Sequence, residues 1–295
     1  MKTKIISAVY FDLYGTDLGG RPGRNDHYLY SLNSIMGSNT AQFVIYTNDK
    51  NKVDEFFTQY YPDKLSRYSS IEYDLYNTEY KDKINQKKNL LETRKSDRCI
   101  ELQYCKLSWL KMNVSSDVEY IYWIDAGLCY SGLLPNKYLK IGPNYNDSYY
   151  GSDIFTSKFI DNLNTEARDK IIVCAKDNVD YYWDCGVPEQ YFKSFNSSYH
   201  IIGGLFGGNS QTVNNLCSLF YLLANNLLDK EDRIYSEEQI LSCLFFNYPE
   251  LFNPQTFDIW WHEDNISGNL GKEEGSRLLQ RAKSFYKILE KFILT

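Results

Sequence analysis

The stretch that decides the fold runs from Val118 to Gly127 and reads Val-Glu-Tyr-Ile-Tyr-Trp-Ile-Asp-Ala-Gly. Aromatic and β-branched residues fill it until Asp125, where it ends in an acid and two small residues. Such a run predicts a buried strand that delivers Asp125 to its carboxyl-terminal edge. Ligands of open α/β sheets collect at that edge, where a carboxylate beside small residues can meet a metal ion or a sugar. Because Asp and Gly also form turns, a purely structural role is the alternative.

Strand and helix patterns alternate on either side of this run. Apolar runs predict further strands at 4–13, 42–47, 71–75, 171–175, 199–206 and 257–261. Helical spacing predicts helices at 26–36, 99–112, 159–170, 212–228, 236–246 and 277–294. Asn48-Asp49 is expected to cap another helix that ends at Tyr60, and Ser-Glu-Glu-Gln at 236–239 predicts a capping box. The polar stretch 78–98 is either a solvated helix or a mobile loop, and 144–151 is expected to be a loop.

This alternation predicts an α/β fold with a mixed, largely parallel sheet flanked by helices. The 295 residues are enough for one large domain or two small ones. Because no repeat and no long low-complexity linker interrupts the chain, we expect one elaborated domain over residues 1–295.

Composition and charge restrict the class of protein. The formal net charge is -6, and the basic residues are scattered without the stripe that nucleic-acid binding needs. The 7 cysteines include no pair with zinc-site spacing, so reduced thiols in a cytoplasmic protein are expected. Asp12 interrupts the apolar run after the charged start, so no signal peptide is predicted. No run approaches the ~18 apolar residues of a membrane helix.

Five motifs follow one another in a recognisable order. They are Val-Ile-Tyr-Thr-Asn-Asp at 44–49, Lys106 on a helix, Trp-Ile-Asp-Ala-Gly at 123–127, Ile-Ile-Gly-Gly-Leu-Phe-Gly-Gly-Asn at 201–209 and Ser-Glu-Glu-Gln-Ile-Leu at 236–241. Together they resemble a bacterial glycosyltransferase of the GT-A type, and more narrowly the HtrL/YibB family associated with surface polysaccharide genes. The resemblance covers residues 4–261. It implies a GT-A-like domain whose residues 1–127 bind a nucleotide sugar and whose residues 128–295 bind the acceptor.

The resemblance places Asp125 where GT-A enzymes carry an Asp-x-Asp motif. In those enzymes the acids hold a divalent metal that bridges the donor diphosphate. Mg²⁺ or Mn²⁺ prefers oxygen ligands and offsets charge on the leaving nucleotide. Here the second acid is replaced, so either His262 supplies a ligand, with Asp264 as a weaker substitute, or no metal is used. A surface histidine beside two acids is the alternative for His262.

Other residues are expected along the donor by the same resemblance. Lys106 can reach the diphosphate as a point charge, and Arg21 or Arg24 can grip a phosphate bidentately from the loop after the first strand. The nucleotide base would lie where the second strand ends, beside Tyr46, Thr47 and Asn48. The structural alternatives are a solvated helix lysine, solvated loop arginines and an ordinary helix N-cap.

The acceptor side is expected in the second half of the chain. Gly203 and Gly204 let the backbone approach a ligand closely, and in similar glycosyltransferases this strand lines the donor or acceptor sugar. A tight structural strand is the alternative. Glu238, in preference to Glu237, is expected to be the general base toward the acceptor hydroxyl, because such enzymes often take an acid from this region. Both acids are equally explained by helix capping.

The resulting functional prediction is a cytoplasmic glycosyltransferase of hexosyl or N-acetylhexosaminyl type. By resemblance the donor is a UDP-sugar, and the acceptor is a growing surface glycan of a capsule or a lipopolysaccharide. A lipid-linked acceptor would bring the enzyme to the inner face of the cytoplasmic membrane. The C-terminal helix at 277–294, with basic residues among apolar ones, either contacts that surface or simply packs.

Two alternatives belong to other classes. The first is a non-catalytic, GT-A-like sugar-binding protein that lost turnover with its second acid. The second starts from Phe-Asp-Leu-Tyr-Gly-Thr at 11–16, which resembles the Asp-x-Asp-Gly-Thr signature of haloacid-dehalogenase-type phosphatases. Tyr14 replaces the second Asp of that signature and removes its general acid.

Overall fold

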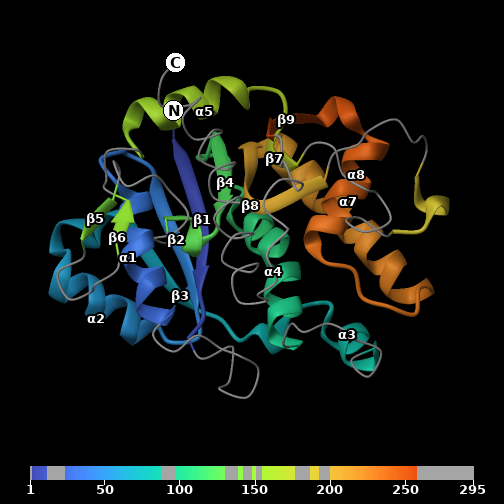
Figure 1. Ribbon diagram of the computed structural model, residues 1–295, viewed down its shortest axis with the longest axis horizontal. Coiled ribbons are helices and arrows are strands. Elements are labelled where there is room, and N and C mark those ends of the chain that lie inside the picture. Colours follow the sequence, from blue (N-terminus) through green and yellow to red (C-terminus); the bar gives the residue numbers. More distant parts are fainter. Residues whose placement is uncertain are drawn as a thin grey trace, which may run out of the picture.

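The computed structural model describes residues 2–11, 24–87, 97–129, 139–141, 148–150, 155–176, 187–192 and 200–257. A seven-stranded sheet forms its centre, with strand order β3-β2-β1-β4-β8-β7-β9 (Figure 1). These strands are β1 (Thr3–Val9), β2 (Gln42–Thr47), β3 (Tyr68–Glu72), β4 (Tyr120–Ile124), β7 (Ile171–Lys176), β8 (His200–Asn209) and β9 (Phe252–Phe257). A separate two-stranded sheet pairs β5 (Leu139–Ile141) with β6 (Ser148–Tyr150).

The central sheet is mixed and largely parallel, which confirms the predicted α/β class. Strand β1 pairs in parallel with β2 and β4, β2 with β3, and β7 with β9. Strand β8 runs antiparallel to both of its neighbours, β4 and β7. Every residue of β4 is buried, as expected of a strand covered on both faces, and Asp125 follows its last residue.

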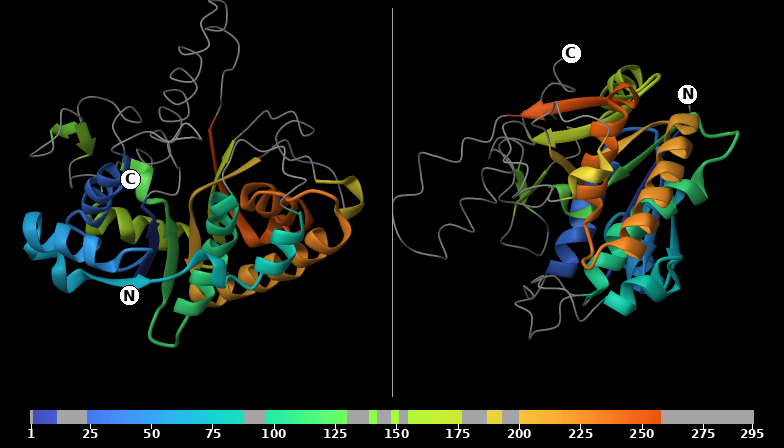
Figure 2. Two further views of the ribbon diagram at one scale, coloured as in Figure 1. Left: turned by 90° about the horizontal axis from the view of Figure 1, so that it is seen from below. Right: turned by 90° about the vertical axis from the view of Figure 1, so that its right-hand side faces the viewer.

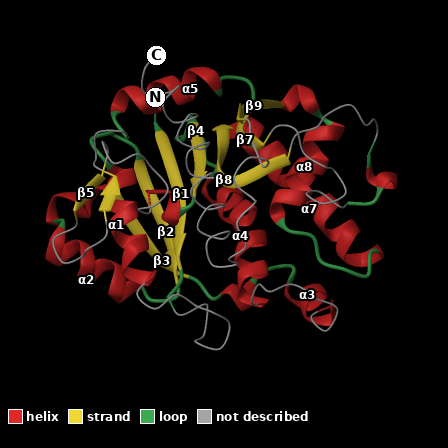
Figure 3. Ribbon diagram, viewed as in Figure 1, coloured by secondary structure: helices red, strands yellow, loops and turns green. Residues whose placement is uncertain are grey.

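Helices cover both faces of this sheet (Figures 2 and 3). The helices are α1 (Arg24–Met36), α2 (Lys50–Tyr60), α3 (Lys81–Lys87), α4 (Asp97–Asn113), α5 (Ser157–Glu166), α7 (Ser210–Lys230) and α8 (Glu237–Asn247). Side chains of α4, α7 and α8 share one hydrophobic core with Ile6 of β1, whereas those of α1, α2 and α5 share another with its neighbour Ile5. This division follows from the alternation of side chains across a strand.

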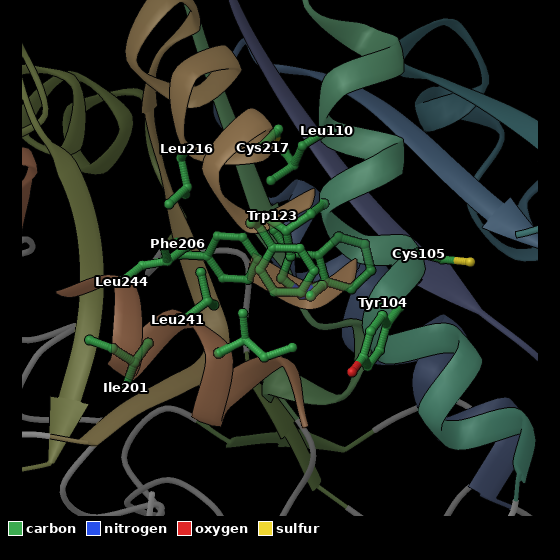
Figure 4. Close-up of a cluster of buried hydrophobic side chains, with 14 of the residues drawn as sticks. Tyr104, Cys105, Leu110, Trp123, Ile201, Phe206, Leu216, Cys217, Leu241 and Leu244 are labelled. Carbon is green, nitrogen blue, oxygen red and sulfur yellow. The ribbon is translucent and has the colours of Figure 1, made fainter. Parts of the chain in front are cut away.

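The core under α4, α7 and α8 supports the carboxyl end of β4. Trp123 of β4 and Phe206 of β8 belong to it together with Leu241 and Leu244 of α8 (Figure 4). Both aromatic side chains are fully buried. Burial of such large apolar side chains dominates the stability of a core and fixes the relative positions of the strands and helices that carry them.

Two predicted helix starts are confirmed in detail. The side chain of Asp49 accepts a hydrogen bond from the backbone N–H of Lys52 at the start of α2. Ser236 and Gln239 form the reciprocal capping box at the start of α8. These caps satisfy backbone donors that a helix start leaves without partners.

Four expectations were wrong or displaced. The edge strand β3 lies at Tyr68–Glu72, whereas a strand was expected at 71–75. The prediction was displaced because Ser69 and Ser70 interrupt the apolar pattern that marks a strand. The edge strand β9 lies at Phe252–Phe257 and contains Pro254, a residue that only an edge strand tolerates; of the expected strand at 257–261, residues 258–261 lie outside the described residues. Strand β1 ends at Val9, and 148–150 forms β6 where a loop was expected.

The polar stretch 78–98 contains the short helix α3, while residues 88–96 and the expected C-terminal helix at 277–294 lie outside the described residues. Cys105, Cys174 and Cys217 carry buried thiols that form no disulfide among the described residues. Among the helices that the structure describes, none is long and apolar enough to cross a membrane.

Candidate functional site

Asp125 stands at the carboxyl end of β4, where β4 lies between β1 and β8. Its backbone N–H donates to the carbonyl oxygen of Gly204 at 2.9 Å, which continues the pairing with β8 by one residue. Its side chain is 41% exposed. The indole Nε1 of Trp123, two residues earlier and on the same face of the strand, donates to Oδ1 of Asp125 at 2.7 Å. The carboxylate is therefore held by the strand that delivers it.

Lys106 of α4 lies at the centre of the site. Its side chain is only 6% exposed, and its ammonium lies 5.3 Å from the centre of the Trp123 ring. Nζ is 3.0 Å from Oδ1 of Asp125, and it donates to Oε1 of Glu237 at 2.6 Å and to the carbonyl oxygen of Gly203 at 3.1 Å. Burial disfavours the charged lysine, but the neighbouring carboxylates of Asp125 and Glu237 outweigh burial and raise the pKa of Lys106 well above its ordinary value.

Glu237, the first residue of α8, completes this ion cluster. Its side chain is 3% exposed, and burial raises the pKa of Glu237 while the ammonium of Lys106 opposes that rise. A Cβ added to Gly203 would lie 2.5 Å from Oε1 of Glu237, so only glycine leaves room for this carboxylate. The glycines were expected to let a ligand approach the backbone closely. At Gly203 the group that approaches is the carboxylate of Glu237.

Glu238 occupies the more accessible position in the first turn of α8. It is partly exposed, and its Oε1 accepts a hydrogen bond from the backbone N–H of Gly203 at 2.9 Å. Ser242, one turn further along α8, accepts a hydrogen bond from the backbone N–H of Ile201 at 2.8 Å. These bonds fix α8 against β8, so that both acids lie beside Gly203.

The structure therefore brings together Asp125, Lys106, Gly203, Gly204 and Glu238, all of which the sequence singled out. In the described part of the chain, the contacts of the Asp125 carboxylate are made by Oδ1. Its Oδ2 is thus the oxygen that can accept a sugar hydroxyl or meet a cation. This arrangement can orient a polar ligand at the exposed rim of the sheet.

The three residues at the end of β2 have structural partners. Tyr46 is 1% exposed, its ring stacks on Trp109 with centroids 4.6 Å apart, and its hydroxyl accepts a hydrogen bond from Asn113. Thr47 is fully buried, and its hydroxyl accepts the backbone N–H of Asp49 at 3.1 Å. The side chain of Asn48 pairs with the backbone of Phe11: its Oδ1 accepts from the N–H at 2.9 Å, and its Nδ2 donates to the carbonyl oxygen at 3.0 Å. Contact of these residues with a nucleotide stays a prediction.

Several predicted residues fall outside the described part of the chain. These are Arg21 and His262, together with the alternative candidates Asp12 and Asp264. Arg24 is the first residue of α1, and its side chain is not among those described.

A metal ion was expected between Asp125 and His262. Within the described residues, no three His, Cys, Asp or Glu side chains gather closely enough to hold a metal ion. Oδ1 of Asp125 already lies beside the ammonium of Lys106, which leaves Oδ2 as its candidate ligand atom. One oxygen does not form a metal site alone, so the metal and its second ligand stay predictions.

The partnership between Lys106 and Glu237 was missed, although the sequence held a signal for it. Lys106 lies in line with Leu102, Trp109 and Leu110 on the apolar side of α4. A lysine in an apolar helical stripe is rarely buried without a carboxylate partner. The two adjacent acids at the start of α8 were the available candidates.

The sequence matches no protein-family model and no curated protein. Among solved structures, apo mouse xyloside xylosyltransferase 1 is 11% identical, with a TM-score of 0.46 over 95% of this chain and 94% of that chain. The 4-diphosphocytidyl-2C-methyl-D-erythritol synthase of Anaerococcus prevotii DSM 20548 is 9% identical, with a TM-score of 0.42 over 96% of each chain. At these values neither structure identifies a substrate for this chain.

Proposed function

We propose that this chain is a glycosyltransferase of the GT-A type that uses a nucleoside diphosphate sugar as donor. The observation that carries the proposal is the meeting of Asp125, Lys106, Gly203 and Glu238 at the end of β4. These residues are far apart in sequence, and the sequence assigns all of them to sugar transfer. They come together at the sheet edge where α/β proteins bind ligands.

In this proposal Asp125 and Glu238 have different roles. Asp125 presents Oδ2 to the donor, while its other oxygen is held by Trp123 and Lys106. Glu238 is the general base, because it is partly exposed, whereas Glu237 is buried in its ion pair with Lys106. Catalysis then rests on orienting donor and acceptor at this edge and on stabilising the charge of the leaving nucleoside diphosphate.

A divalent cation would offset the negative charge that develops on the leaving diphosphate. Asp125 would hold it together with His262 or with another ligand outside the described residues. The finer assignments rest on the sequence resemblance: membership of the HtrL/YibB family, a UDP-sugar donor, a capsule or lipopolysaccharide acceptor, and a cytoplasmic enzyme at the membrane surface.

The proposal is tested by measuring the binding and turnover of donors. The purified chain is titrated by calorimetry with UDP-glucose, UDP-galactose and their N-acetylated forms, with and without Mn²⁺, and UDP release is then followed. We expect one donor to bind and to be slowly hydrolysed, and Asp125→Asn to lower the rate by about 100-fold or more. The control is Asp161→Asn on the exposed side of α5. Full activity in Asp125→Asn would refute the assignment of the site.

A non-catalytic sugar-binding protein is the second candidate. It is favoured by Ala126 and Gly127, which follow Asp125 where a second metal-binding acid is expected in GT-A enzymes. Donor binding without UDP release, under every metal condition and with a panel of acceptors, would support this candidate over the enzyme.

A further inference from the structure

We infer that Lys106 is a positioning residue that holds Asp125, and that Glu237 in turn holds Lys106. The sequence had suggested that Lys106 contacts the donor diphosphate. The inference rests on the proposed function only for its catalytic consequence, because the arrangement itself is a property of the protein without ligand.

The ammonium of Lys106 is already fully engaged. A lysine has three N–H donors and no acceptor. Three oxygens lie within 3.1 Å of Nζ, and they belong to Asp125, Glu237 and the backbone of Gly203. A phosphate oxygen could be bound only by giving up one of these three contacts.

The surroundings of Lys106 also keep it in place. The aliphatic part of the side chain is buried, and the ammonium lies against the ring of Trp123. If Lys106 turned toward a ligand, it would leave Glu237 as a buried carboxylate without its cation. Such an uncompensated buried charge is strongly unfavourable, so the ion pair acts as a lock on the orientation of Lys106.

Asp125 is consequently held on one oxygen from two directions. The indole N–H of Trp123 and the ammonium of Lys106 both meet Oδ1, at 2.7 and 3.0 Å. With Oδ1 fixed, the direction of Oδ2 is fixed as well. Lys106 and Glu237 therefore act on a ligand through Asp125, by presenting its second oxygen in one orientation before the ligand arrives.

The first experiment examines the protein without ligand. In a nitrogen-15 NMR spectrum the Trp123 indole signal is assigned from its loss in Trp123→Phe. The test variant is Lys106→Met/Glu237→Gln, which removes both members of the buried pair and leaves only the partly exposed carboxylate of Asp125 without its ammonium. We expect exchange of the Trp123 indole proton with solvent to accelerate at least about tenfold, because Asp125 is no longer held in place.

Two controls separate positioning from general loosening of the fold. The Trp109 indole is buried in the same core and makes no hydrogen bond to the residues that the structure describes, so its exchange should not change in the test variant. Lys111→Met, on the exposed side of α4, should leave both signals as in the wild type. Unchanged exchange at Trp123, or equal acceleration at Trp109, would overturn the inference.

The second experiment measures affinity for UDP in the presence of Mn²⁺. Affinities are compared for wild type, Asp125→Asn, the double variant and the triple combination. If Lys106 acts through Asp125, the triple variant binds UDP as Asp125→Asn does, within about twofold. Losses that multiply would instead place Lys106 on the diphosphate and overturn the inference. If the wild type binds no UDP, the proposed function fails, while the NMR experiment still decides the role of Lys106.

Discussion

The carboxylate of Glu237 occupies the space that a side chain at Gly203 would need. A Cβ at position 203 would lie 2.5 Å from Oε1 and 3.3 Å from Cδ of Glu237. This carboxylate cannot easily move aside, because it is buried and bound to Lys106. The glycine is therefore part of the ion cluster, although it contributes no side chain to it.

We expect Gly203→Ala to lower the free energy of unfolding by about 1–3 kcal/mol, since the added methyl group overpacks a buried polar contact. Urea denaturation measures this change. The matched control is Gly127→Ala, where the added Cβ meets the ring edge of Tyr28 at 2.8 Å. Tyr28 is partly exposed, so its ring has more room to shift than the buried carboxylate of Glu237, and the control should lose less stability. An equal or smaller loss in Gly203→Ala would contradict the packing described for Glu237.

Removal of Lys106 alone should make stability depend on pH. Burial raises the pKa of Glu237, and Lys106→Met removes the charge that opposes this rise. A carboxyl group whose pKa is higher in the folded state favours folding while protonated, and this stabilisation is lost as the pH rises from the unfolded pKa, about 4.3, toward the folded value. As the pH rises from about 4 to about 8, the free energy of unfolding of Lys106→Met should thus fall by about 3 kcal/mol or more relative to that of Lys106→Met/Glu237→Gln.

The wild type is the reference for this experiment: the pKa of Glu237 is raised there too, but the ammonium of Lys106 opposes the rise, so wild-type stability should fall less over this range. The pKa of Lys106 is raised, so the stability that its ammonium contributes is fully present below the unfolded pKa of about 10.4 and is lost only at higher pH. Urea denaturation at several pH values compares the three proteins. If the free energies of unfolding of Lys106→Met and of the double variant change with pH in the same way, Glu237 is not the group that titrates.

The side chain of Glu238 can be altered without removing its hydrogen bond. In Glu238→Gln the amide oxygen can still accept the N–H of Gly203, but the base is lost. We expect kcat for sugar transfer to fall by about 100-fold or more with donor affinity unchanged. Steady-state kinetics at saturating donor measure this, and thermal unfolding confirms the fold. A variant that retains its kcat would exclude Glu238 as the base.

Loss of the hydrogen bond from Trp123 to Asp125 should reduce both stability and transfer activity. Trp123→Phe keeps an aromatic ring in the core but removes the N–H that meets Oδ1 of Asp125. We expect a loss of about 1–3 kcal/mol in the free energy of unfolding from the hydrogen bond to a charged group and the smaller ring. Transfer activity should also fall. Trp109→Phe, whose indole has no hydrogen-bond partner within the described ranges, should lose stability by packing alone. Equal effects on transfer in the two variants would contradict a specific role for the indole of Trp123.

Local patterns were sufficient to predict much of the fold and part of the site. The apolar run before Asp125, the cap at Asp49 and the capping box at Ser236 are all encoded within a few neighbouring residues, and the structure confirms them. Strands β3 and β9 were predicted too far along the chain, because each lies at an edge of the sheet and lacks a clear apolar run. An edge strand needs less apolar sequence, as the serines of β3 show, and it tolerates Pro254 of β9, which would break the ladder of a central strand.

The pairing within the site could not be predicted from local pattern. Lys106 and Glu237 are 131 residues apart, and nothing near either residue specifies the other. The sequence indicated that Asp125, Lys106 and Glu238 belong to one site. It predicted a contact of Lys106 with the donor diphosphate, whereas in the structure the ammonium contacts the carboxylates of Asp125 and Glu237. The number of acceptors around one ammonium is a property of tertiary packing.

Strand β8, which runs antiparallel to β4, joins the two halves of the chain at a buried ion pair. Lys106 and Asp125 come from the first half of the chain, whereas Gly203 and Glu237 come from the second. A chain divided between residues 129 and 155 would therefore yield one fragment with an excess buried acid and another with a lysine short of an acceptor. Neither fragment could bury its share of the charge alone. Reassembly would bury the shared apolar core of Trp123 and Phe206, and only the reassembled protein would pair Lys106 with Glu237.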